Sequence, residues 1–345
     1  MKQTTPFERG AAVISIDTEQ IWGHMDLMNE RQFEKRYPCV REIHDRLLEL
    51  LSAEGIGATW TVVGAMSLAE SRGALDERMQ GLPEHWTARI PAGDERTHPL
   101  WYARSFVRQL QRARTPQEIG MHGGISHLIW GDRGTSSTAA ERELRAGMQA
   151  LLEIGIRPRS FVFPRDLEAH LAVLGECGIR CYRGRSPILS ERFGYSKIGG
   201  IVRAAEELAR LTPMVVWPEE SQPGLWNLRP SMFIYSLGAE RCRIVPARLR
   251  VDRTRIGLKA AIRRQGIFHL ALHPENLAES LFAFSVFESM IHEICRFRDR
   301  HGLETLTMIQ GVDRVAPCRQ ADERKADGRN VAGRSASVQK AMLSA

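Results

Sequence analysis

Residues 118–127 read EIGMHGGISH, and this stretch combines a short predicted strand with two histidines, His122 and His127. The first five residues are predicted to form a β-strand, which Gly123–Gly124 then end. Neutral imidazoles are good zinc ligands, so both histidines are candidate ligands of a divalent metal ion. Two nearby histidines also occur as hydrogen-bonded loop residues, so this stretch alone leaves both interpretations open.

Strand-length apolar segments alternate with helical segments on both sides of this stretch. Strands are predicted at residues 11–16, 58–63, 118–122, 159–163, 179–183, 267–272 and 306–309. Helices are predicted at residues 32–53, 102–113, 138–155, 168–177, 258–264 and 282–300. This alternation predicts an α/β protein with a parallel sheet, either open or closed into a barrel.

Polar residues follow four of the predicted strands. They are Asp17, His122, Pro164–Arg165 and His273, each at or just after the end of its strand. In (β/α) barrels, functional residues lie at the carboxyl ends of the strands. We therefore expect these residues to lie at one edge of the sheet.

Two segments interrupt the alternation. Residues 70–100 are rich in proline, glycine and charge, and they form either a lid over one face or an insertion that Trp86 and Trp101 pack down. Residues 316–345 are polar and charged and are predicted to form a disordered tail, which leaves 1–315 as the barrel domain. Gly199–Gly200 are predicted to form a turn.

Composition restricts the class of protein. The chain has 345 residues, of which 43% are hydrophobic, enough for a sizeable core. No apolar run approaches the roughly 20 residues of a membrane helix, and no signal peptide is recognisable, so a cytoplasmic protein is expected. The net charge of +7 is spread along the chain without a nucleic-acid-binding motif, so no nucleic-acid partner is expected. The six cysteines lack metal-site spacing and are predicted to be free thiols.

Five segments resemble, in order, the motifs of the polysaccharide deacetylase family with the NodB homology domain. The resemblance covers roughly residues 10–315, and members of this family are distorted (β/α) barrels. The segments are SIDTE (15–19), EGIGATWTVVG (54–64), EIGMHGGISH (118–127), FVFPRD (161–166) and LALHPENL (270–277).

This resemblance implies a metal-dependent hydrolase that removes an acetyl group from an N-acetylated saccharide. A metal-bound water would be the nucleophile, and zinc is the expected ion. Carried over by motif, Asp17 is the catalytic base, and His122 and His127 are metal ligands. His273 is the general acid that protonates the leaving amine.

The chain departs from the family pattern in its ligand set. Thr18 stands where the family has a second aspartate, so Glu19 is the expected third ligand unless it faces solvent or pairs with an arginine. Asp17 itself is the alternative ligand. His122 and His127 are one residue further apart than is usual in the family. Gly123–Gly124 are expected either to absorb the extra residue in a bulge or turn, or to displace one ligand.

The family's arginine before the proline of the third motif is also missing. Arg165 follows Pro164 instead and is expected to reach the Asp17 carboxylate or to pair with Asp166.

Other residues are candidates for substrate contact. Trp22 offers a face for sugar stacking or packs in the core. Glu275 orients His273, binds substrate or caps the following helix, and His269 is expected to be a core histidine. Two alternative functions stay open: a degenerate barrel that binds a glycan or protein partner without catalysis, and an amidohydrolase of a non-sugar amide. The oligomeric state is undetermined.

Overall fold

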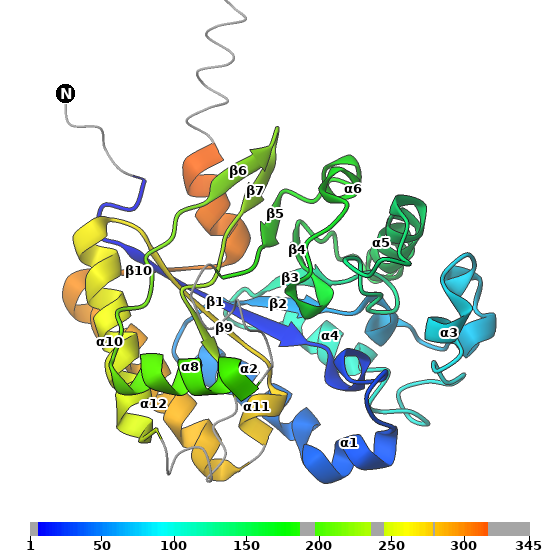
Figure 1. Ribbon diagram of the computed structural model, residues 1–345, viewed down its shortest axis with the longest axis horizontal. Coiled ribbons are helices and arrows are strands. Elements are labelled where there is room, and N and C mark those ends of the chain that lie inside the picture. Colours follow the sequence, from blue (N-terminus) through cyan, green and yellow to red (C-terminus); the bar gives the residue numbers. More distant parts are fainter. Residues whose placement is uncertain (1–5, 187–196, 236–244, 279, 317–345) are drawn as a thin grey trace, which may run out of the picture.

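The computed structural model describes residues 6–186, 197–235, 245–278 and 280–316. They form a curled, mostly parallel β-sheet with helices around it (Figure 1). The strands follow the order β6-β7-β5-β4-β3-β2-β1-β9-β8, and β10 also pairs with β1. Their bounds are β1 Ala11–Thr18, β2 Thr59–Val62, β3 Glu118–His122, β4 Ser160–Val162, β5 Cys181–Arg183, β6 Glu219–Gln222, β7 Leu225–Asn227, β8 Met232–Ile234, β9 Ile267–Leu272 and β10 Glu304–Leu306. This curled half-barrel confirms the predicted distorted (β/α) barrel.

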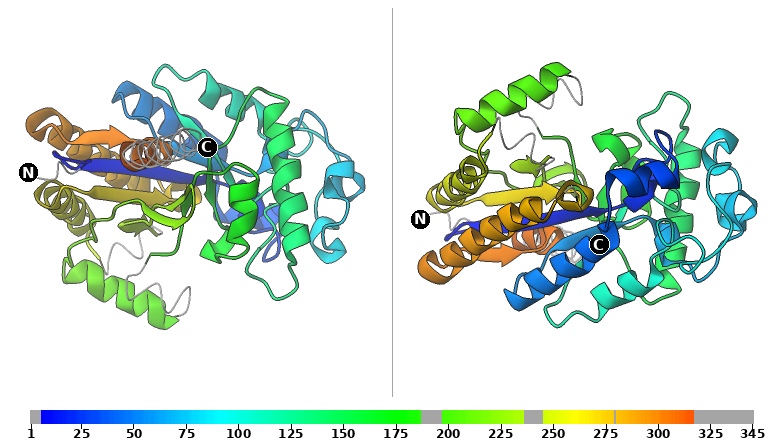
Figure 2. Two further views of the ribbon diagram at one scale, coloured as in Figure 1. Left: turned by 90° about the horizontal axis from the view of Figure 1, so that it is seen from above. Right: turned by 90° about the horizontal axis from the view of Figure 1, so that it is seen from below.

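Helices connect most of the strands and cover the outside of the sheet (Figure 2). The α-helices are α1 Glu30–Arg36, α2 Val40–Ala53, α3 Glu84–Thr87, α4 Arg104–Gln111, α5 Ser137–Leu152, α6 Leu171–Glu176, α8 Lys197–Leu208, α10 Ala247–Arg264, α11 Glu275–Ala278 and α12 Leu281–His301. Short 3-10 helices are η1 Gln20–Gly23, η2 Gly64–Ser67, η3 Gly73–Leu75, η4 Glu77–Met79 and η5 Pro164–Asp166. No described helix is long and apolar enough to cross a membrane.

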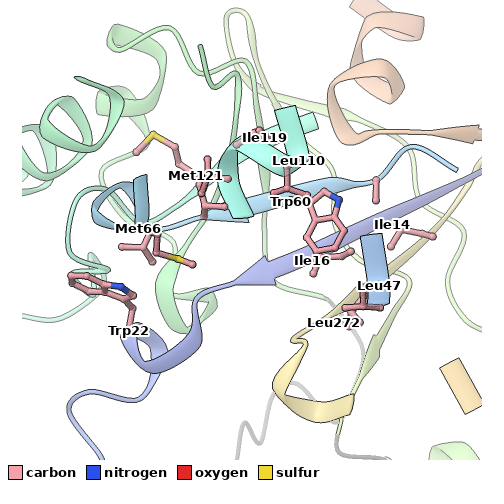
Figure 3. Close-up of a cluster of buried hydrophobic side chains, with 14 of the residues drawn as sticks. Ile14, Ile16, Trp22, Leu47, Trp60, Met66, Leu110, Ile119, Met121 and Leu272 are labelled. Carbon is pink, nitrogen blue, oxygen red and sulfur yellow. The ribbon is translucent and has the colours of Figure 1, made fainter. Parts of the chain in front are cut away.

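The central strand β1 shows why the sheet forms here. Its sequence AAVISIDT is buried at all eight positions, because β2, β9 and β10 pair with it, helices cover its outer face and residues of other strands fill the inside of the curled sheet. Figure 3 shows the core beside it, where Ile14 and Ile16 meet Trp60 of β2 and Leu47 of α2. Asp17 lies near the carboxyl end of this buried strand, so the fold places a carboxylate at the sheet edge.

Several predicted elements differ from the observed ones. The helix predicted at 32–53 is two helices, because the chain turns at Pro38 and at Cys39, whose φ is +62°. The strand predicted at 306–309 ends at Leu306, and residues 308–316 are helical. Gly199–Gly200 lie inside α8, so the predicted turn is wrong. Beyond Ala316 the predicted disordered tail lies outside the described residues.

The insertion at residues 70–100 is held against the barrel by tryptophans. Trp86 donates a hydrogen bond from Nε1 to the Ser126 carbonyl at 2.9 Å. Trp22 donates from Nε1 to the Trp101 carbonyl at 2.7 Å, and the two rings meet edge to face. The four described cysteines are free thiols, as predicted, although Cys39 is exposed.

Two core histidines should make the protein sensitive to acid. Burial lowers the pKa of both His44 and His269 to about 3. Unfolded histidine has a pKa near 6.5, so the unfolded state takes up protons first as the pH falls. The stability contributed by neutral burial is therefore complete above about pH 6.5 and declines below it, down to about pH 3.

We expect each of these histidines to lower the free energy of unfolding by about 2 kcal/mol between pH 7 and pH 5. Urea unfolding with a chelator present, at both pH values, measures this change. In His44→Phe the free energy of unfolding should fall by about 2 kcal/mol less between pH 7 and pH 5 than in the wild type. An equal loss in wild type and variant would show that His44 is not held neutral.

Candidate metal centre and catalytic residues

The predicted gathering of polar residues at one sheet edge is confirmed. Asp17 of β1, His122 at the end of β3 and His273 directly after β9 line one cavity, as does Arg165 after β4. The cavity has a volume of about 1000 Å³. The carboxyl ends of neighbouring parallel strands meet at this edge, which explains how residues so far apart in sequence come together.

Glu19, His122 and His127 converge on one point at the floor of this cavity. Glu19 Oε2 lies 2.7 Å from His122 Nε2 and 2.9 Å from His127 Nε2. All three side chains are buried, and one donor atom from each lies within 4.8 Å of the others. Glu19 is buried and makes no ion pair with an arginine of the described residues, so its placement is the one expected of the third ligand.

The hydrogen bonding of the two imidazoles suits metal ligation. His122 Nδ1 donates to the Val162 carbonyl at 3.2 Å, so Nε2 is the nitrogen that faces Glu19. Burial opposes protonation of His122, but Glu19 and Asp17 outweigh it and raise its pKa. Without a metal ion Nε2 therefore donates a proton to Glu19 Oε2, and a metal ion would take the place of that proton. Burial lowers the pKa of His127, so this ring is neutral near pH 7. Neither of its nitrogens has a hydrogen-bond partner among the described residues, although Nε2 lies 2.9 Å from Glu19 Oε2.

A buried imidazole nitrogen without a hydrogen bond is costly unless another partner satisfies it. Two imidazole nitrogens and one carboxylate oxygen form the ligand set of many catalytic zinc sites, which keep a further position open for water or substrate. The residues present therefore fit a divalent metal ion. Glu19, His122 and His127 would hold it.

The loop between the two histidines depends on the predicted glycine pair. Gly123 has a φ of +70°, and His127 itself has a φ of +60°, a conformation that non-glycine residues seldom adopt. A Cβ atom on Gly124 would lie 2.1 Å from the Glu143 carbonyl oxygen. The glycines thus absorb the additional residue and leave both histidines directed at Glu19.

Glu143 of α5 holds this loop and was not predicted from the sequence. Its Oε1 accepts hydrogen bonds from the backbone N–H groups of Gly124, Ser126 and Leu128 at 2.9–3.2 Å. Its Oε2 accepts from the Ser126 hydroxyl at 3.0 Å. The available signal was a glutamate at a buried position of an amphipathic helix, one turn from both Ala139 and Gly147.

Glu143→Ala should leave three buried N–H groups without an acceptor. We expect the free energy of unfolding to fall by about 2–4 kcal/mol and the metal affinity to fall roughly 10- to 100-fold. Glu141→Ala on the same helix is the matched control, since among the described residues Glu141 forms an ion pair with Arg145 at the surface. Chemical denaturation and metal titration measure both effects. Metal affinities that match in the two variants would rule out a positioning role for Glu143.

Asp17 is bound by Arg183, which the sequence analysis does not predict as a site residue. The guanidinium of Arg183 donates to Asp17 Oδ1 at 2.8 Å and to Oδ2 at 2.5 Å, and both side chains are 1% exposed. Burial opposes the charged form of Asp17, but Arg183 and the neighbouring histidines outweigh it and lower its pKa. Asp17 is therefore ionised near neutral pH and has a fixed orientation.

Arg165 does not contact Asp17, so the predicted role for it is wrong. Its Nη2 donates to Asp26 Oδ1 at 2.7 Å, and its backbone has a φ of +59° that turns it toward the loop after β1. The alternative partner, Asp166, lies 3.5 Å from Arg183 instead. Arg183, at the end of the next strand in the sheet, occupies the position beside Asp17.

A network behind Arg183 fixes its direction. Ser15 Oγ accepts from Arg183 Nη1 at 3.0 Å and lies 2.9 Å from His269 Nε2. His269 Nδ1 lies 3.0 Å from the Arg229 carbonyl. Since the Arg229 carbonyl only accepts, His269 carries its proton on Nδ1 and accepts from Ser15 at Nε2. His269 is thus a satisfied core histidine, as predicted.

His273 faces both carboxylates from the other side of the site. Its Nε2 lies 3.3 Å from Asp17 Oδ2 and 3.4 Å from Glu19 Oε1, and the side chain is 21% exposed to the cavity. The neighbouring Glu275 is buried at the cavity wall, and neither carboxyl oxygen has a hydrogen-bond partner among the described residues. Burial, together with Glu19 nearby, raises the pKa of Glu275 well above its usual range.

Trp22 cannot stack on a sugar, so the predicted substrate contact is wrong for this residue. Its side chain is fully buried against Trp101 and does not line the cavity. His24, two residues on, does line the cavity, and burial lowers its pKa to about 4. The described aromatic residues at the cavity wall are Tyr37, Phe163, Phe233 and Tyr235.

Comparison with known proteins gives matches at the level of the fold. No protein-family model matches the sequence, and no curated protein matches it. A solved structure from Mycobacterium smegmatis, assigned as a polysaccharide deacetylase, is 16% identical with a TM-score of 0.53, and the match covers 92% of each chain.

Two solved structures of other enzymes share the fold. A GH57-type branching enzyme from Pyrococcus horikoshii is 11% identical with a TM-score of 0.51, over 88% of this chain and 70% of that one. A 4-alpha-glucanotransferase from Thermococcus litoralis is 13% identical with a TM-score of 0.50, over 89% of this chain and 40% of that one. The chain thus shares its fold with a protein assigned as a polysaccharide deacetylase and with enzymes that act on glucans.

Proposed function

We propose that this protein is a metal-dependent hydrolase that removes an acetyl group from an N-acetylated saccharide. The observation that carries the proposal is the convergence of Glu19, His122 and His127 on one point, with Asp17 and His273 beside it. The fold shared with a protein assigned as a polysaccharide deacetylase supports the same function. A bound divalent ion would lower the pKa of a coordinated water molecule and polarise an amide carbonyl.

The residues of the chain supply the proton transfers that amide hydrolysis requires. Asp17, ionised and held by Arg183, accepts a proton from the attacking water. His273 donates a proton to the amine nitrogen, so that the C–N bond breaks with a neutral amine as leaving group. Because His273 Nε2 and Asp17 Oδ2 are 3.3 Å apart, both reach one substrate group, and Arg183 prevents Asp17 from turning away.

Acetate release tests the proposal. The full chain, loaded with zinc, cobalt or manganese, is incubated with N-acetylated mono- and oligosaccharides, and acetate is quantified with and without a chelator. We expect release that the chelator abolishes and added metal restores. Saccharide binding without acetate release under any metal would instead identify a barrel that binds glycans without catalysis.

A further inference from the structure

The cavity above the candidate metal centre has an apolar wall formed by one face of α8. Ile201, Ala204, Ala205 and Leu208 all line it, at the spacing of one helical stripe. Ile201 is 70% exposed and Leu208 is 48% exposed. Figure 2 shows α8 standing away from the sheet beside α10. This apolar stripe therefore faces the cavity and not the protein core.

Apolar side chains also line the cavity opposite α8 and near its floor. Leu27 and Met28, in the loop after β1, line it, and Leu27 is 63% exposed. Phe233 of β8 lines the cavity and contacts the ring of His273, with 5.1 Å between ring centroids. The apolar surface thus continues from α8 to the catalytic residues without leaving the cavity.

Two arginines that line the cavity from α8 and α10 are engaged within the protein, whereas Arg36, which also lines it, is exposed. Arg250 Nε lies 3.1 Å from Glu207 Oε2. The guanidinium of Arg203 lies over the Tyr235 ring, 4.3 Å from its centroid. Aliphatic surface is therefore the main feature that these walls offer to a ligand.

We propose, on the basis of the hydrolase function above, that the substrate is an N-acylated amphiphile. Its amide lies at Glu19, His122 and His127, and an apolar arm attached to the amino sugar lies along α8. The cavity volume of about 1000 Å³ leaves room for both parts, and ligand pockets of roughly 300–1,000 Å³ hold molecules of that size. A polysaccharide chain would place hydroxyl groups against these aliphatic side chains, where they lose hydrogen bonds to water.

Alkyl glycosides provide the test. Methyl and octyl glycosides of N-acetylglucosamine, below their micellar concentrations, are titrated into the full chain and followed by calorimetry. Each methylene removed from water tightens binding roughly 2- to 4-fold, and the two glycosides differ by seven methylenes, so the octyl glycoside should bind at least about 100-fold more tightly. Ile201→Asp should remove most of this difference.

Ile198→Asp is the matched control, because Ile198 is 59% exposed on the same helix but does not line the cavity. It should keep the full preference for the octyl glycoside. Thermal melting confirms that each variant folds, and Leu208→Asp replaces Ile201→Asp if the latter does not. Octyl binding no tighter than methyl binding, or equal losses in the Ile201 and Ile198 variants, overturns the proposal. Acetate release is measured separately, so its absence counts against the hydrolase function alone.

Discussion

Asp17→Asn is expected to lower kcat for acetate release roughly 10²- to 10⁴-fold, the usual contribution of a general acid or base. Asparagine keeps the shape of the side chain but does not accept a proton from the attacking water. Metal binding should persist if Glu19, His122 and His127 hold the ion, and should be lost if the ion instead sits in the second possible ligand group, Asp17, His122 and His273. Arg183 binds both oxygens of Asp17, which favours the first group. Steady-state kinetics together with metal analysis of the same preparation measures both. Near-normal kcat in Asp17→Asn would exclude Asp17 as the base.

The same substitution should also destabilise the fold, because it leaves the buried charge of Arg183 poorly paired. Removing one partner of a buried ion pair costs about 3–5 kcal/mol, whereas replacing both with apolar residues is often neutral. The double variant Asp17→Asn with Arg183→Met removes the unpaired buried charge and should therefore recover part of the lost stability but not activity. Recovered activity would contradict the assignment of Asp17 as the base.

His122→Ala is expected to abolish metal binding at micromolar metal and with it acetate release. The substitution removes a buried nitrogen that lies 2.7 Å from Glu19, and the remaining pair of ligands does not complete a catalytic set. Competition against a coloured chelator measures the metal affinity, which should fall at least about 100-fold. This loss exceeds the roughly 10- to 100-fold loss that is typical when a residue hydrogen-bonded to a metal ligand is removed. His85→Ala, at an exposed position of α3, is the control and should bind metal normally.

A wild-type metal affinity in His122→Ala would contradict the proposed centre. Loss of activity with metal still bound would point instead to a role for His122 in contacting substrate. Circular dichroism separates both results from unfolding.

Much of the fold was predictable because its strands are strongly apolar and several of them are followed directly by polar residues. The strands 118–122 and 267–272 have the predicted bounds, since both are buried runs that glycine or proline ends. The stretch from residue 184 to 257 was not predicted. There β6 and β8 are four and three residues long, too short to show a clear alternation of apolar and polar residues. Two glycines lower the helix propensity of α8.

The site was predictable for residues inside the family's motifs and unpredictable for residues outside them. His122 and His127 lie in one motif, and Glu19, one residue after the position of the family's second aspartate, lies beside them. Arg183 carries no local signal, because its role arises from β5 lying near β1 across the curled sheet. Arg165 lies next to Pro164 in the third motif, but its left-handed backbone directs its side chain to Asp26. The cytoplasmic location stays a prediction.

Elemental analysis of the purified full chain tests the metal centre most directly. Protein dialysed against a zinc buffer and then against metal-free buffer should retain about one zinc ion per chain, whereas Glu19→Gln and His122→Ala should retain almost none. Wild-type protein without bound metal, or equal retention in all three proteins, would contradict a metal centre formed by Glu19, His122 and His127.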